Sequence, residues 1–130
     1  MVSLSSQSKK LGEKMSNMQS WKQNVGSIID YAERIFPEVE IVTRSLSGEI
    51  VKSNYGQVAK RAKKLGSALE SYGIKHGQNV GSLALNTYRN MEMYYGISGM
   101  GAVMHTINFR LHPEQVVYII NHAENRIIFL

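Results

Sequence analysis

The sequence contains no cysteine, which excludes a disulfide framework and any metal site built on thiolates. Long apolar runs are also missing. The longest have four to five residues, far short of the roughly 20 that a membrane-spanning helix needs. The first residues lack the apolar stretch of a secretory signal. These absences fit a reducing compartment, and we expect a cytoplasmic location.

Acidic residues are the scarcer charged type, since 10 Asp and Glu stand against 15 Lys and Arg and leave a net charge of +5. Such a surplus could serve nucleic acid or an anionic membrane. The basic residues cluster only at Lys9–Lys10 and within residues 60–64, and no aromatic residues alternate with them for base stacking. We interpret them as a basic tail and a solvated helix face, and expect no nucleic-acid partner and no membrane span.

The length of 130 residues suits about one domain, and 43% hydrophobic with 19% charged residues is an ordinary globular composition. Residues 1–20 are rich in Ser, Lys, Met and Gln without a clear period. We expect them to form a disordered leader. The remaining residues, 21–130, are predicted to form one α/β unit.

A helix and a hairpin are predicted first. Apolar residues recur at three- and four-residue steps from position 25 to 35, and Phe36-Pro37 ends this helix because the residue before proline avoids helical torsions. Two β-rich runs follow, at residues 40–44 and 49–52. They flank Ser45–Gly48, whose glycine can take the positive φ of a hairpin turn.

The next helix has clear start and stop signals. Asn54 is predicted as its N-cap, with Gln57 as the capping-box partner. Gly73 is predicted as a left-handed C-terminal residue, followed by an apolar contact from Ile74. The buried stripe is predicted to consist of Tyr55, Val58, Ala62, Leu65, Leu69 and Tyr72.

The second half alternates short apolar runs with helical patterns. The runs are residues 79–85, 104–109 and 125–130. The first intervening helix starts after Asn86 or Thr87, with Tyr88, Met91, Tyr95 and Ile97 facing inward. The second opens at His112-Pro113 and carries a wide apolar face of Val116, Val117, Ile119 and Ile120.

Such alternation favours a parallel sheet with right-handed crossovers. The predicted fold class is therefore α/β: an N-terminal helix and β-hairpin, followed by a β-α-β-α-β unit with a mostly parallel sheet.

The glycine-rich stretch Gly96–Gly101 is not interpreted as a phosphate loop. A phosphate-binding loop follows a strand and opens a helix, whereas these glycines fall at the end of a helix and before a strand. We expect them to allow close approach of helix and sheet. No GxxxxGK[ST] motif occurs in the sequence.

The remaining candidate residues are scattered. The histidines form no HxxxH or HExxH pair. His112 suits a helix start, His122 a helix C-terminus, and His105 a partly buried strand position or, less favoured, a cleft at the carboxyl ends of strands. Glu92, Glu114 and Glu124 fall on separate elements. The sequence therefore assigns no catalytic, cofactor-binding or metal-binding residue.

Residues 21–130 resemble the start of the AMP-forming acyl-CoA synthetases, most closely their medium- and long-chain fatty-acid ligase branch. The stretches "YYGISGMGAVMHTINFRLHPEQVVYIINHAE" and "YGIKHGQNV" carry the resemblance. The chain departs from the family at His76, where proline is usual, at Gln78, where aspartate is usual, and at Phe109, where proline is frequent. These departures touch turns and not the residues of the chemistry.

The resemblance implies ATP-dependent activation of a carboxylate to an acyl-adenylate, followed by thioester formation with CoA. ATP, Mg and CoA are thus implied for full-length members. The family's phosphate loop, ribose-binding aspartate and catalytic lysine follow the segment seen here, and none of these motifs occurs in this sequence. We expect a truncated, inactive N-terminal portion without a cofactor of its own.

This interpretation predicts two partners, and two other interpretations remain open. The partners are the remainder of the synthetase and a second copy of the chain, joined through an exposed sheet edge. Two other hypotheses remain open from the sequence: a stand-alone assembly module with the same fold, and a basic nucleic-acid or membrane-surface binder.

Overall fold

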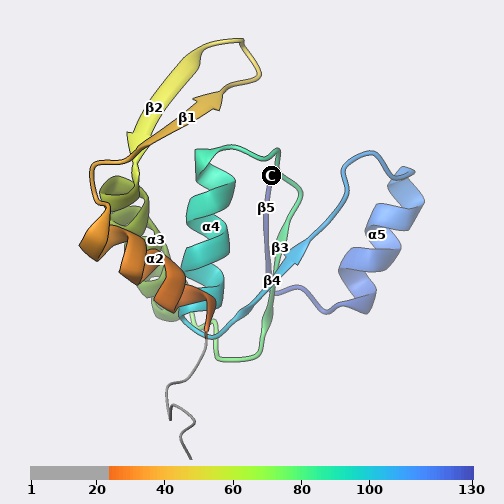
Figure 1. Ribbon diagram of the computed structural model, residues 1–130. Helices are drawn as coiled ribbons and strands as arrows, with labels where there is room; N and C mark the ends of the chain where they lie inside the picture. The colour runs from red at the N-terminus through yellow and green to blue at the C-terminus, as the bar shows by residue number, and fades with distance from the viewer. Residues whose placement is uncertain (1–23) are drawn as a thin grey trace, which may run out of the picture.

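The computed structural model describes residues 24–130, which form four helices and five strands (Figure 1). The predicted leader at residues 1–20 lies outside the described residues. The elements in chain order are α2 (Val25–Ile35), β1 (Glu40–Arg44), β2 (Ile50–Asn54), α3 (Tyr55–Ser71), β3 (Asn79–Ser82), α4 (Tyr88–Gly99), β4 (Val103–Thr106), α5 (Pro113–His122) and β5 (Ile127–Phe129).

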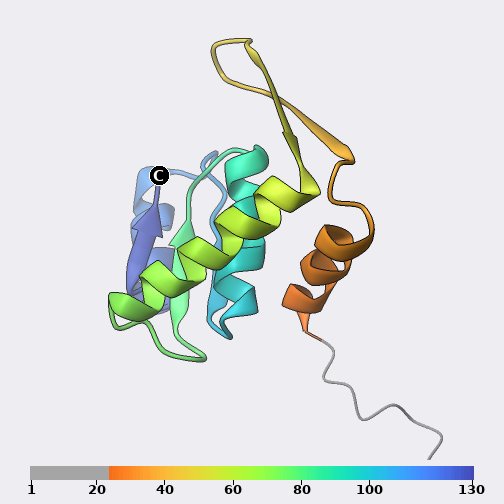
Figure 2. The same cartoon turned by 90° about the vertical axis from the view of Figure 1, so that its left-hand side faces the viewer.

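The strands form two separate sheets. β1 and β2 pair antiparallel as a hairpin that stands away from the body in both views (Figures 1 and 2). The other sheet has the order β4-β3-β5, with both pairs parallel. Helices α4 and α5 lie on opposite faces of this sheet, and α2 and α3 lie on the α4 side (Figures 1 and 2). The predicted α/β class and parallel sheet are confirmed.

The core lies between the sheet and the layer of α3 and α4. Its buried members are Leu69, Ile74, Val80, Met93, Ile97 and Ala102. A smaller cluster joins α2 to α3 through Ile29, Val58 and Ala59. On the opposite face, α5 buries no residue. The apolar face predicted for α5 is therefore only partly covered, because Val117 is 58% exposed and no other described helix packs against it.

Three helices end in the same hydrogen-bonded turn, and each turn leads into a strand of the parallel sheet. In α3, the N–H of Gly73 donates to Glu70 O and the N–H of Ile74 to Leu69 O. Gly73 has a φ of 87°, so the predicted helix stop is confirmed. The same turn follows α4 at Gly101 and α5 at Glu124.

The glycines of α4 serve helix–helix packing, which corrects the predicted helix–sheet role. A Cβ on Gly96 would lie 2.7 Å from the carbonyl oxygen of Ala62 in α3, and one on Gly66 would lie 3.2 Å from Gly96 O. Gly99 similarly faces Gly26 of α2. Only residues without a side chain let the three backbones approach this closely.

Several side-chain predictions need correction. Tyr72, predicted for the buried stripe of α3, is 82% exposed because the helix ends there and Tyr72 is its C-cap residue. Asn54 caps α3 as predicted, with Oδ1 accepting from Gln57 N, but the Gln57 side chain accepts from Ser53 Oγ instead of completing a capping box. Of the residues predicted to face inward from α4, Ile97 is buried and Tyr88, Met91 and Tyr95 are half-buried. Met93, which was not predicted, is buried as well.

The sheet edges and the helix lengths bear on two expectations from the sequence, namely self-association and the lack of a membrane span. β4 and β5 form the two edges of the parallel sheet within residues 24–130, so self-association through an edge stays a prediction. The described helices include none with the length and apolarity required to traverse a bilayer.

We expect Gly96→Ala to destabilise the fold by about 1–3 kcal/mol, because the added methyl group forces α3 and α4 apart. Gly99→Ala is the matched control. Its Cβ would meet only Gly26 Cα at 3.8 Å, so helix propensity predicts a gain of up to about 1 kcal/mol. Urea unfolding followed by circular dichroism measures both variants, and equal effects would contradict the close contact.

Candidate functional site

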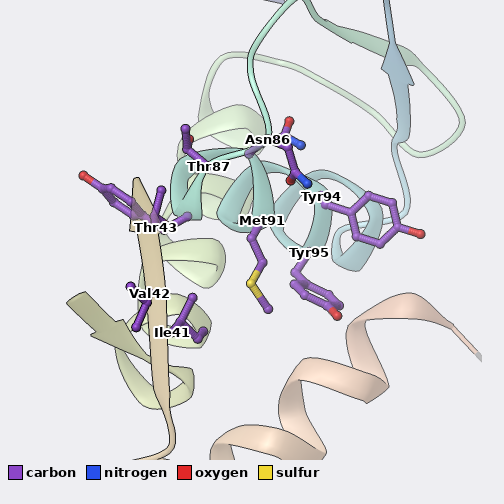
Figure 3. A pocket seen from close by; sticks show the side chains of 10 residues that line it. Ile41, Val42, Thr43, Asn86, Thr87, Met91, Tyr94 and Tyr95 are labelled. Atoms are coloured by element: carbon purple, nitrogen blue, oxygen red, sulfur yellow. The ribbon is translucent and has the colours of Figure 1, made fainter. Parts of the chain in front are cut away.

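Two cavities meet at the first residues of α4. The α4 cavity, of about 370 Å³, lies between β1 and α4 (Figure 3). A larger groove, of about 1270 Å³, runs between the hairpin, α3, α4 and the end of β5. Thr43, Thr87 and Tyr88 line both cavities. The start of α4 is therefore accessible from both sides.

The two walls of the α4 cavity differ in polarity. Figure 3 shows Thr43, Asn86 and Thr87 around the start of α4, with Met91 and Tyr95 further along the helix toward α2. Met91 and Tyr95 also pack against the cluster around Ile29. Burial raises the pKa of the Tyr95 hydroxyl, with smaller contributions from the neighbouring tyrosines. The polar end of this cavity is thus the end at the helix start.

The first turn of α4 has no side-chain cap. Its N-cap residue Thr87 makes no capping hydrogen bond, and no acidic residue lies in the first turn. In α2 and α3, by contrast, Asn24 and Asn54 accept from Ser27 N and Gln57 N. Helix starts carry unsatisfied N–H groups and a partial positive charge. In α5, the acidic Glu114 lies in the first turn. Among the described helices, α4 is therefore the one whose start has neither a side-chain cap nor an acidic residue.

An ion pair between an exposed arginine and a buried carboxylate joins α3 to α4 beside the groove. Nε of Arg61 lies 2.9 Å from Oε1 of Glu92, whose side chain is only 10% exposed. The two atoms are not aligned as a hydrogen bond, so Oε1 is buried without one. Burial raises the pKa of Glu92, and the Arg61 charge opposes this effect. Arg61 thus offsets part of the cost of burying the Glu92 carboxylate.

Cation–π contacts with Tyr88 hold two arginines near the start of α4. The guanidinium carbons of Arg61 and Arg89 lie 5.7 Å and 5.8 Å from the ring centroid of Tyr88. Nε of Arg89 also donates to Tyr88 Oη at 3.2 Å. Cation–π contacts of this kind orient guanidinium groups without neutralising them. The start of α4 is thereby positively charged.

The histidines are not brought together. His105 in β4 contacts Asn125 at 3.1 Å between Nδ1 and Oδ1, so its strand position is confirmed. His76 packs against Gly101, where any Cβ would lie 2.3 Å from its ring. His112 precedes α5, where its backbone N–H donates to Gln115 Oε1, and His122 stacks on Tyr118 in the last turn.

The acidic candidates are not brought together either. Glu92 lies in α4, Glu114 opens α5 and Glu124 follows that helix. Within residues 24–130 no group of three or more His, Asp or Glu side chains could hold a metal ion. The cavity walls offer hydroxyl, guanidinium and helix N–H donors, a set suited to binding an acceptor-rich group. The absence of assigned catalytic residues stays a prediction.

The sequence analysis did not predict that four residues of this site come together in two pairs. Thr43 and Thr87 meet only through the fold, as do Arg61 and Glu92. One signal was available: Glu92 falls between Met91 and Met93 in a mostly apolar helix, and buried carboxylates need a partner. Nothing in the sequence identified Arg61 as that partner.

We expect Arg61→Gln to lower the free energy of unfolding at neutral pH by about 1–2 kcal/mol, because Glu92 is left buried without its partner. The loss is limited because solvent already screens the exposed part of Arg61. A carboxyl whose pKa is higher in the folded than in the unfolded state stabilises the fold when it is protonated. The loss should therefore shrink as pH falls and Glu92 takes up a proton. Urea unfolding between roughly pH 4 and pH 7 measures this trend.

Lys60→Gln, an exposed change one position earlier in α3, is the control and should stay within about 0.5 kcal/mol of the parent. A pH-independent loss in Arg61→Gln would show that packing, not the Glu92 charge, governs the site.

Comparison with known proteins matches this unit to a part of much longer enzymes. A 105-residue match is 46% identical to a 3-methylmercaptopropionyl-CoA ligase of Ruegeria lacuscaerulensis and covers 81% of this chain and 20% of that enzyme. A medium-chain-fatty-acid–CoA ligase of Ectopseudomonas oleovorans is 42% identical, with 82% and 19% covered. A long-chain-fatty-acid–CoA ligase of Thermus thermophilus is 36% identical over 121 residues, with 90% and 22% covered.

The chain thus spans about a fifth of the length of these relatives. Among solved structures, the N-terminal domain of FACL13 from Mycobacterium tuberculosis superposes with a TM-score of 0.74 at 23% identity, covering 82% of this chain and 26% of that one. At that identity the likeness supports the fold alone. The family model described as AMP-binding enzyme matches residues 31–130. The resemblance predicted from the sequence is therefore confirmed, and the chain belongs to the AMP-binding enzyme family.

Proposed function

We propose that this chain supplies the first α/β unit of a medium- or long-chain fatty-acid–CoA ligase. The observation that carries this proposal is the match to carboxylate–CoA ligases at 36–47% identity over 105 to 121 residues. All of these relatives join a carboxylic acid to CoA according to their names. The acids differ, so the support is stronger for the ligase class than for one chain length.

The proposed reaction has two steps. The acid carboxylate displaces pyrophosphate from ATP and forms an acyl-adenylate, and the CoA thiol then displaces AMP to form the thioester. ATP, Mg and CoA are the cofactors and substrates implied for the full-length family. Residues 24–130 would contribute the α2–α3–α4 layer and the parallel sheet, on which the remainder of the ligase would build. A cytoplasmic location is part of this proposal, supported by the lack of cysteine.

We expect the 130-residue chain alone to show no fatty-acid-dependent ATP–pyrophosphate exchange. The physical reason is that the described residues bring no phosphate loop and no catalytic lysine to the cavities at α4. Exchange of labelled pyrophosphate into ATP, with and without dodecanoate or palmitate, measures this activity. Robust acid-dependent exchange would mean that the chemistry resides in residues assigned here to scaffolding.

A chimera tests the positive side of the proposal. Residues 24–130 should replace the matching segment of the Thermus thermophilus long-chain ligase and leave acid-dependent thioester formation within about tenfold of the parent, since about 1.4 kcal/mol of misfit corresponds to tenfold in rate. Thioester formation from palmitate, ATP and CoA is the measurement, and the acid preference should remain that of the recipient enzyme.

The same chimera carrying Gly96→Ala is the matched control, and its thermal midpoint should fall because α3 and α4 separate. A well-folded, soluble chimera without activity would contradict the equivalence of the two segments.

A further inference from the structure

The outer side of α2 exposes a continuous group of apolar side chains. Ile28, Tyr31 and Ile35 lie on one stripe of the helix, and Phe36 and Val39 follow its end. Each of these five side chains is between 47% and 59% exposed. The rings of Tyr31 and Phe36 stand edge to face with centroids 6.2 Å apart, so the stripe continues beyond the helix. We call these five residues the α2 patch.

The opposite side of α2 already has its partners. Ile29 is buried in the cluster that joins α2 to α3, and Asp30 and Glu33 form ion pairs with Lys63 of α3. Figures 1 and 2 show α2 as the outermost helix of its layer, with one side turned away from α3 and α4. The α2 patch is therefore not the surface that attaches α2 to the rest of the unit.

The area of the α2 patch is sufficient for contact with a second copy of the chain. Single exposed apolar residues are ordinary, but a continuous apolar patch marks a contact surface. From their exposed fractions, the five side chains present roughly 500 Å² per copy, so two patches face to face would bury roughly 1,000 Å², the lower limit for a specific interface. Such an interface is expected to be weak.

The spacing of the stripe suits a second helix. Ile28, Tyr31 and Ile35 are separated by three and then four residues, which is the spacing of the apolar seam along which two helices interlock their side chains. In an antiparallel pair with a two-fold axis at Tyr31, the two Tyr31 side chains meet at the axis. Ile28 of one copy then lies near Ile35 of the other, so the same patch serves both copies.

The charges on α2 favour this partner over a membrane surface. Between residues 25 and 35, the acids Asp30 and Glu33 outnumber the single base Arg34, whereas helices that lie on anionic membranes carry Lys and Arg beside their apolar face. In the antiparallel pair the two helix dipoles oppose each other. Arg34 then falls beside the first turn of the other copy, which carries no charged residue. The pair therefore brings no like charges together.

We propose that α2 packs antiparallel against α2 of a second copy of this chain, with the α2 patch as the core of the interface and Tyr31 at its centre. This surface differs from the sheet edges at β4 and β5, and it does not depend on the proposed ligase function. Because the buried area is at the lower limit for a specific interface, we expect a dissociation constant on the order of 10–100 μM.

Sedimentation equilibrium of the 130-residue chain across this concentration range measures the dimer. Tyr31→Glu places a charge at the centre of the interface and should weaken the dimer by roughly tenfold or more. Tyr118→Glu is the matched control, because Tyr118 is an exposed tyrosine on α5, on the other face of the sheet. This variant should dimerise like the parent.

The thermal midpoint of each variant, followed by circular dichroism under conditions in which the chain is monomeric, separates loss of the dimer from loss of the fold. We expect both midpoints to stay close to that of the parent, since both tyrosines are exposed. A parent chain that stays monomeric over the whole range would overturn the proposal. Equal weakening of the dimer by the two variants would do the same.

The lack of cysteine allows a direct test of the orientation. Tyr31→Cys should form an intermolecular disulfide on mild oxidation, because the two copies of residue 31 face each other at disulfide distance. Ile28→Cys and Ile35→Cys should each cross-link poorly alone, and a mixture of the two should cross-link more than either. Tyr118→Cys is the control and should stay monomeric.

Two results of the cross-linking would contradict the antiparallel α2 pair. Efficient cross-linking of Ile28→Cys with itself would show a parallel arrangement. Cross-linking of Tyr118→Cys in place of Tyr31→Cys would move the interface to α5.

Discussion

The backbone contact between α3 and α4 is the constraint on which the rest of the unit depends. Gly96 meets the Ala62 carbonyl, and Gly66 meets the Gly96 carbonyl, so the two helix backbones approach closely at these glycines. This distance brings Arg61 within 2.9 Å of Glu92 and lets Met93 and Ile97 reach the parallel sheet. It also fixes where α4 begins, and thus where the two cavities meet.

Features determined by adjacent residues were predictable from the sequence. The Asn54 cap, the Gly48 hairpin turn and the Gly73 helix stop each depend on positions within a few residues, and all three were confirmed. The alternation of apolar runs with helices was enough for the parallel sheet, since a crossover helix joins parallel neighbours. The strand order, with β3 central, required the structure.

What the sequence could not reveal depends on contacts between distant residues. The small residues at positions 96–101 were assigned to helix–sheet packing, because nothing in their pattern tells which backbone they meet. Arg61 and Glu92 belong to different helices, and Thr43 reaches α4 only because the hairpin folds beside it. Tyr72 fits a helical stripe by spacing, yet the helix ends there and the side chain stays in water.

The turn after α5 has a consequence for local dynamics. The equivalent turns after α3 and α4 carry glycine, whereas this one carries Glu124 at a φ of 49°. A left-handed backbone costs a residue with a Cβ roughly 1 kcal/mol, and α5 has no buried side chain to offset that cost. Helix α5 should therefore unfold locally more readily than α3 and α4. Its amide hydrogens should exchange with solvent before those of α3 and α4.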